Sequence, residues 1–90
     1  MVTGFEKDPQ AVKDYMIDWT AWLNGDTIST STWTVPDGLT QSSEATKTAS
    51  TTTVWLAGGV AGNVYQVTNH ITTAGGRQED HTLRFHIKEQ

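Results

Sequence analysis

The sequence predicts an all-β fold, a single antiparallel β-sandwich of about seven short strands. Three observations favour it. Threonine and serine fill 21 of the 90 positions, and threonine is a β-branched residue that suits strands. Turn signals built on glycine and proline recur roughly every 8–12 residues, the spacing typical of immunoglobulin-like sandwiches. A chain of 90 residues has room for one such domain and no second core.

Residues 1–12 are predicted to form an extended N-terminal arm, and residues 13–90 the immunoglobulin-like β-sandwich domain. The arm is polar, and its apolar side chains are mainly Val2, Phe5 and Val12. These are too few to pack as part of a core, and such segments often become ordered only against a partner. We therefore expect the arm to lie outside the sandwich.

Residues 13–25 are compatible with two secondary structures. A helix over 9–24 would place most apolar residues on one stripe but leave Ile17 outside it. In a strand, Ile17 and Trp19 share one face, and β-branched and aromatic residues suit a strand. We favour a strand at 14–19 followed by a tight turn, with the helix as the open alternative.

The next segment predicts a strand over 26–36 with an irregularity inside it. Trp33 and Val35 share one face, whereas Ile28 has the wrong parity to join them. A bulge between Ser29 and Thr32 would bring all three apolar side chains to the same face.

The middle of the chain predicts a turn, an edge strand and an inner strand. Proline and glycine within 36–38 favour a turn, because proline presets φ and glycine allows positive φ. Residues 39–50 are polar on both faces, which is typical of a sheet edge. The segment 51–56 places Val54 and Leu56 on one face and is the stronger strand.

The C-terminal part predicts a β-hairpin around Gly75 and Gly76. In an antiparallel hairpin, the numbers of the two residues opposite each other have a constant sum. Val67 and Phe85 lie on the same face only if this sum is even, such as 152 or 154. A two-residue glycine turn gives an odd sum. We therefore expect a loop of three or five residues that reaches Arg77 or Gln78.

Tyr65 begins the first strand of this hairpin and is a candidate structural corner. In immunoglobulin-like folds, a tyrosine at this place bonds through its hydroxyl to the backbone a few residues upstream. An ordinary interfacial tyrosine is the alternative. The predicted core comprises Ile17, Trp19, Trp33, Val35, Val54, Leu56, Tyr65, Val67, Leu83, Phe85 and Ile87.

Composition excludes several function classes. The net charge is −4, and the six Lys and Arg residues are scattered, which argues against nucleic-acid binding. The chain has no cysteine and no three convergent histidine or carboxylate ligands, so we expect no metal, no cofactor and no catalytic residue. No apolar run is long enough for membrane insertion, and the first residues show no signal peptide.

Two aromatic residues are predicted to contact partners. Trp55 has the opposite parity to Val54 and Leu56, so it points away from the core. Outward aromatic residues suit a protein partner or a sugar, although burial by a neighbouring loop is an equally good explanation. Phe5 is the aromatic residue of the arm and the expected anchor there.

A set of short motifs in a fixed order extends over nearly the whole chain. The motifs are Lys7-Asp8-Pro9; Asp14-Tyr15, Ile17-Asp18-Trp19 and Trp22-Leu23; Gly25-Asp26-Thr27-Ile28; Trp33-Thr34-Val35-Pro36 and Gly38-Leu39; Thr53-Val54-Trp55-Leu56 and Gly58-Gly59; Tyr65 and Val67-Thr68-Asn69; Thr73 and Gly75-Gly76-Arg77. Together they resemble a family of small tailed-bacteriophage and prophage proteins, the fiber–tail adaptors, which have an immunoglobulin-like fold.

The resemblance implies a non-enzymatic virion structural protein, assembled in the bacterial host cytoplasm, that links fibers or other tail components to the tail. Its partners would be copies of itself in a symmetric assembly and other phage tail or fiber proteins. The alternatives are an immunoglobulin-like binding module for a host-surface glycan or protein, and a capsid or neck decoration protein.

Overall fold

In the computed structural model, which describes residues 2–89, eight strands and one helical turn follow one another. They are β1 (Val2–Lys7), β2 (Lys13–Asp18), α1 (Thr20–Leu23), β3 (Ile28–Thr34), β4 (Leu39–Gln41), β5 (Thr46–Lys47), β6 (Thr51–Gly58), β7 (Val64–Thr73) and β8 (Gln78–Ile87).

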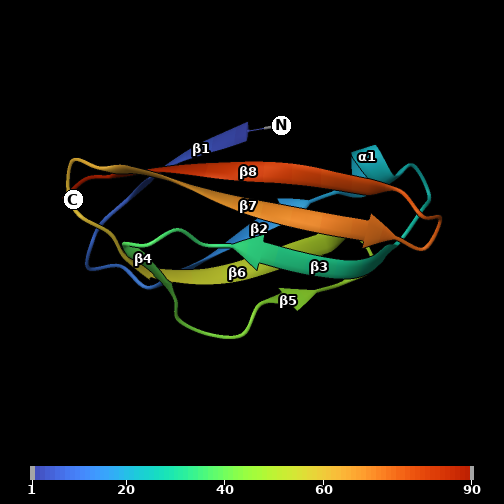
Figure 1. Ribbon diagram of the computed structural model, residues 1–90, viewed down its shortest axis with the longest axis horizontal. Helices are drawn as coiled ribbons and strands as arrows, with labels where there is room; N and C mark the ends of the chain where they lie inside the picture. The colour runs from blue at the N-terminus through green and yellow to red at the C-terminus, as the bar shows by residue number, and fades with distance from the viewer. Residues whose placement is uncertain (1, 90) are drawn as a thin grey trace.

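The strands form two sheets, which pack against each other. The first sheet has the order β1-β8-β7-β3, and the second has the order β2-β6-β4, with β5 also paired to β6. In Figure 1, β8, β7 and β3 lie side by side, and α1 lies at the same end of the molecule as the β7–β8 turn. The predicted all-β sandwich is confirmed.

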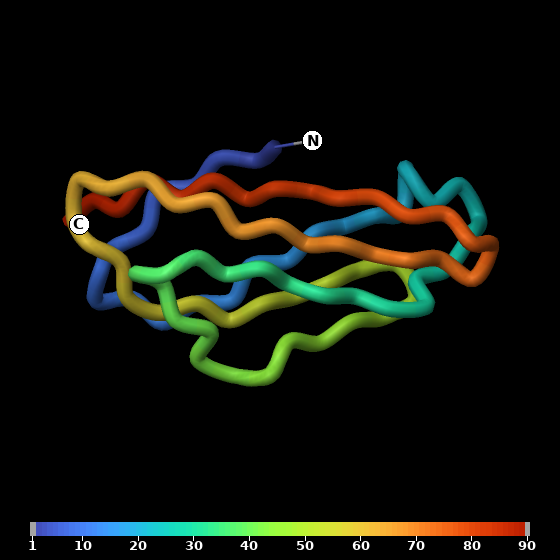
Figure 2. The backbone as a smooth tube through the Cα atoms, viewed as in Figure 1, coloured from blue at the N-terminus to red at the C-terminus, as the bar shows by residue number. Residues whose placement is uncertain are grey.

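β1 differs from the predicted arm. It pairs in parallel with β8, from Val2 opposite Thr82 to Lys7 opposite Ile87. Main-chain hydrogen bonds between strands need no apolar side chains. The small number of apolar residues in this segment therefore did not predict its pairing with β8. Figure 2 shows the chain then crossing to β2 in the second sheet, at the end where the C-terminus lies. Met1, the first residue of the predicted arm, lies outside the described residues.

Residues 13–25 adopt the strand and not the long helix. β2 covers Lys13–Asp18, and only one helical turn, α1, follows it. The turn ends at Asn24, whose φ of 48° is left-handed. Alternation along β2 buries Tyr15 and Ile17 against the first sheet.

The predicted bulge lies near the start of β3. The register with β7 shifts between Ile28 and Thr30, so Ser29 is the extra residue, at the near end of the predicted interval. The parity change buries Ile28 and turns Trp33 partly inward. The polar edge expected over 39–50 is divided into two short strands, β4 and β5, which both pair with β6.

The hairpin has the predicted parity but a different centre. Tyr65 pairs with Phe85 and Val67 with Leu83, so the paired numbers add to 150 and not to 152 or 154. The loop has three residues, because the Thr73 amide donates to the Arg77 carbonyl (2.8 Å) and the Gly76 amide to the Thr73 carbonyl (3.0 Å). Gly76, with φ 86°, takes the left-handed position that ends a three-residue hairpin loop.

The core lies between the two sheets. Most predicted core residues are buried, whereas Trp33, Val35 and Tyr65 pack on its margin. The buried apolar residues are Tyr15, Ile17, Trp19, Leu23, Ile28, Leu39, Val54, Leu56, Val67, Ile71, Leu83, Phe85 and Ile87.

Arg77 fastens the hairpin tip to α1. Its guanidinium donates to the Leu23 carbonyl (2.6 Å) and lies over the Trp22 ring, 4.4 Å from the ring centroid. Carbonyls at the end of a helix have no partner within the helix. The arginine therefore caps α1 from a distant element.

Candidate interaction surfaces

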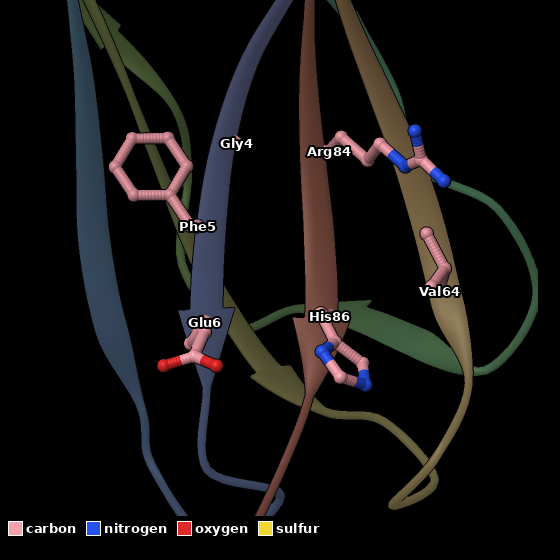
Figure 3. A pocket seen from close by; sticks show the side chains of 6 residues that line it. All are labelled: Gly4, Phe5, Glu6, Val64, Arg84 and His86. Atoms are coloured by element: carbon pink, nitrogen blue, oxygen red, sulfur yellow. The ribbon is translucent and has the colours of Figure 1, made fainter.

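A hollow of about 380 Å³ lies on the outer face of the first sheet. Two rows of paired residues define it: Gly4 lies opposite Arg84, and Glu6 opposite His86, which in turn lies opposite Val64. Figure 3 shows Arg84 extending from β8 across β7, on the side away from Gly4. The lining residues are Gly4, Phe5, Glu6, Val64, Arg84 and His86.

The hollow combines cationic and apolar groups. Within residues 2–89, the side chains of Arg84 and His86 are exposed and make no hydrogen bond or ion pair. Val64 beside them is 46% exposed. Glu6, the acidic member, lies 3.9 Å from the Lys88 ammonium, which partly balances its charge.

Phe5, the expected anchor for a partner, lies mainly against its own core. Its ring stacks on Phe85, with 5.4 Å between centroids, and meets Tyr15 edge-on at 5.1 Å. It is half-buried, and it also lines the hollow. A partner contact by Phe5 stays a prediction.

Lys7 lies two residues after Phe5 in β1, and the residue is 2% exposed. Its ammonium donates to the main-chain carbonyls of Gly58 (2.7 Å) and Asp8 (3.0 Å). Burial lowers the pKa of Lys7, because a desolvated ammonium is less stable than a hydrated one. This burial was not predictable from the sequence, since lysine is rarely a core residue.

Trp55 points out of the second sheet, as its parity predicts. It lies opposite Asp14 on β2 and is 37% exposed. Met16, paired with Thr53, is 56% exposed on the same strand pair. The Trp55 face, as we name these four residues, is thus apolar and faintly acidic. Its role in binding stays a prediction.

Tyr65 makes the contact that a tyrosine corner requires. Its hydroxyl accepts a hydrogen bond from the Val60 amide (3.3 Å), five residues upstream, and one from the Asn63 side chain (3.4 Å). Its ring packs on Gly38, where a Cβ would lie 2.6 Å from a ring carbon. Gly38 also has a φ of 101°, so both conformation and space favour glycine there.

A buried polar network joins the two sheets, and sequence reasoning missed it. The Trp19 indole donates to Thr52 (3.1 Å) and to Asn69 (3.2 Å), and the Thr52 hydroxyl donates to Asn69 (2.7 Å). The Asn69 amide donates to Ser31 (2.9 Å) and to the Thr32 carbonyl (3.0 Å). The one available signal was the inward parity of Asn69 between Val67 and Ile71.

The histidines lie apart in the structure. His70 contacts Asp80 (2.5 Å) and Gln78 (3.0 Å) through its two ring nitrogens, and these hydrogen bonds, the one to Asp80 first, raise the pKa of His70. Burial beside Trp19 lowers the pKa of His81. Between residues 2 and 89, no three histidine or carboxylate groups are placed to hold a metal ion.

These features define the class of protein: a small β-sandwich with a hollow on the outer face of one sheet and an exposed tryptophan on the other. In the described part of the chain, no helix is long and apolar enough to cross a membrane.

A family model described as "Podophage GP4 fiber-tail adaptor protein gp77" matches residues 7–86, and the chain belongs to this family. It is therefore a structural component of the phage virion, and it contacts other tail or fiber components. No curated protein matches the sequence.

Proposed function

We propose that the chain is a non-enzymatic structural adaptor that links fibers, or other tail components, to the phage tail. The observation that carries this proposal is the match of residues 7–86 to the fiber-tail adaptor family. The exposed groups on both sheets support it, because an adaptor must hold two partners at once. The hollow around Arg84 and the Trp55 face lie on opposite sides of the sandwich.

The immunoglobulin-like character of the sandwich belongs to this proposal. β2, β6 and β4 share one sheet, and β3, β7 and β8 the other. In immunoglobulin domains, strands B, E and D are separated from strands C, F and G in the same way. Tyr65 then begins the strand that corresponds to F, where a tyrosine corner is expected.

Copies of the chain associate in a symmetric assembly, formed in the host cytoplasm. β1 supplies a route, because among the described strands it pairs only with β8. Exchange of β1 between two copies would keep the contacts of Phe5 and Lys7 while joining the copies. Light scattering tests this: the full chain should form oligomers that the chain lacking residues 1–8 does not form. A full chain that stays monomeric at high concentration contradicts the exchange.

Trp55 favours one second candidate function, recognition of a host-surface glycan or protein. Its ring is exposed on a strand face, where sugars stack. Binding to a glycan array that disappears with Trp55→Ala would support this candidate. A blank array leaves the adaptor function as the better explanation.

The adaptor function is tested by inactivating the gene in the parent phage. Particles purified without the chain should carry normal heads but lack fibers, because nothing joins the fibers to the tail. Mass spectrometry of the particles measures this, and supply of the wild-type chain from a plasmid is the control. A full set of fibers on chain-free particles contradicts the proposal.

A further inference from the structure

We propose that the hollow on the outer face of the first sheet binds an extended, acidic segment of another tail or fiber protein. The segment carries carboxylates at alternate positions that face Arg84 and His86. This inference rests on the proposed adaptor function and adds the chemistry of one partner. Three features of the hollow support it: a glycine with no local explanation, an arginine and a histidine without partners, and the exposed apolar side chain of Val64.

Gly4 has no local reason to be glycine. Its φ is not in the left-handed region, and a Cβ built there would meet nothing within 4 Å. A glycine inside a strand weakens the strand, and it often marks a place where a ligand or another backbone approaches closely. Gly4 lies opposite Arg84, so its missing side chain leaves space on β1 beside the Arg84 main chain, while the guanidinium extends the other way, across β7 (Figure 3).

The charge of the hollow selects the partner. The chain carries a net charge of −4, yet Arg84 and His86 lie together and, within residues 2–89, neither side chain has a hydrogen-bonded or ionic partner. A guanidinium binds a carboxylate through two parallel hydrogen bonds. Glu6 lies opposite His86, but its carboxylate makes its ion pair with the Lys88 ammonium, at 3.9 Å.

The spacing of Arg84 and His86 indicates an extended segment. Arg84 and His86 are two residues apart on one face of β8, which is about 6.8 Å along a strand. An extended segment repeats its side chains on one face at the same interval. Val64, exposed beside His86, then meets an aliphatic group of the segment.

The probes are two synthetic peptides with capped ends, in which threonine fills all positions but three. In the acidic peptide, two glutamates stand at alternate positions and a valine follows them. In the basic peptide, lysines replace the two glutamates. Each is titrated into the full chain labelled with nitrogen-15, and amide chemical shifts are followed. The acidic peptide should shift the amides of Gly4, Glu6, Val64, Arg84 and His86, and added salt should weaken its binding. The basic peptide should shift none of them.

Two variants remove the site in different ways. Arg84→Glu reverses the charge, and Gly4→Leu fills the hollow; each should weaken binding of the acidic peptide by about tenfold or more. Lys47→Glu makes the same charge change on β5 of the second sheet and should leave binding within about twofold. Thermal melting of Gly4→Leu should be unchanged or higher, since leucine has room there and suits a strand better than glycine. Loss of binding is then not loss of folding.

Several outcomes overturn the inference. Equal binding of both peptides, shifts on the Trp55 face instead of the hollow, or unchanged binding by Arg84→Glu and Gly4→Leu would each do so. A thymidine oligonucleotide is titrated as a competing ligand. If it binds the hollow more tightly than the acidic peptide, the site selects phosphate and not carboxylate.

A particle experiment separates this inference from the adaptor function. Phage carrying Arg84→Glu should lack the partner protein, whereas phage carrying Lys47→Glu should contain it. If chain-free particles keep their fibers while the peptide still binds the hollow, the adaptor function fails and the site stands. If chain-free particles lose their fibers but Arg84→Glu particles keep every component, the adaptor function stands and the site fails.

Discussion

Asn69 is the buried polar residue at the centre of the hydrogen-bond network between the two sheets. Its side chain is fully buried and uses both its oxygen and its nitrogen to join Trp19 and Thr52 of one sheet to β3 of the other. A leucine has a similar size but leaves the buried indole N–H with fewer partners. Burying polar groups without partners costs about 1–3 kcal/mol each.

Asn69→Leu should therefore lower the free energy of unfolding by about 3 kcal/mol, measured by urea denaturation. Gln66→Leu is the control, because Gln66 lies on the same strand but is exposed, and its effect should be small. Equal shifts of the two denaturation midpoints would mean that the network contributes nothing.

Tyr65 offers a milder test of the corner. Tyr65→Phe removes the hydroxyl that accepts from Val60 and keeps the ring on Gly38. The free energy of unfolding should fall by about 1 kcal/mol with the fold intact. A midpoint that does not move within error would show that the hydroxyl bond is not stabilising, and that Tyr65 acts only through its ring.

Side-chain parity explains why some residues were predictable. Alternation along a strand is a local property, so the outward Trp55 and the inward Val67, Leu83 and Phe85 followed from the sequence. The burial of Lys7 was not predictable, because it depends on the Gly58 carbonyl, which a distant strand supplies. Likewise, the hollow depends on Gly4 lying opposite Arg84, and that pairing joins the two ends of the chain.

At the scale of elements, β1 is the largest difference from expectation. Its Phe5 ring lies between Phe85 and Tyr15, so it belongs to the packing of the sandwich. Phe5→Ala should lower the free energy of unfolding by about 2 kcal/mol. Val2→Ala on the same strand removes an exposed side chain and should change little. If both variants unfold at the wild-type midpoint, β1 does not stabilise the sandwich.

The β7–β8 hairpin should make stability depend on pH. Hydrogen bonds to Asp80 and Gln78 raise the pKa of His70 in the folded state. The stabilisation is complete below the pKa of an unfolded histidine, about 6.5, and is lost as the pH rises through the higher folded value. His81, whose pKa is lowered by burial, acts in the opposite sense, so a variant is needed to separate the two.

Urea midpoints of the wild type and His70→Gln should therefore differ most at low pH and converge at alkaline pH. His86→Gln is the matched control, because it removes a histidine from the same outer face whose side chain makes no hydrogen bond or ion pair within residues 2–89. A constant difference between His70→Gln and wild type at every pH would show that proton binding at His70 is not linked to folding.

The hairpin also shows the limit of register arithmetic. Burial of both apolar faces required an even sum, and the structure has one. The centre is Gly75 and not a later residue, because Gly76 takes the left-handed position at the end of the loop. The geometry of the turn decided which even sum of paired residue numbers the hairpin adopts. The sequence left this choice open, because either of two adjacent glycines can take the left-handed position.

At the scale of the whole molecule, the sandwich presents two faces of different chemistry. The hollow on the first sheet is cationic around Arg84, and the Trp55 face on the second sheet is apolar with Asp14 beside it. The class of fold followed from composition and alternation. Which strands form which sheet did not, because pairings such as β1 with β8 are non-local.

The central claim is that the chain joins fiber components to the tail, and a cryo-EM reconstruction of the parent particle tests it most directly. The account predicts copies of the sandwich at the junction of tail and fibers, with the hollow at Arg84 covered by an extended segment of a neighbouring protein. Sandwich density on the capsid surface or at a neck without fiber contacts would contradict it.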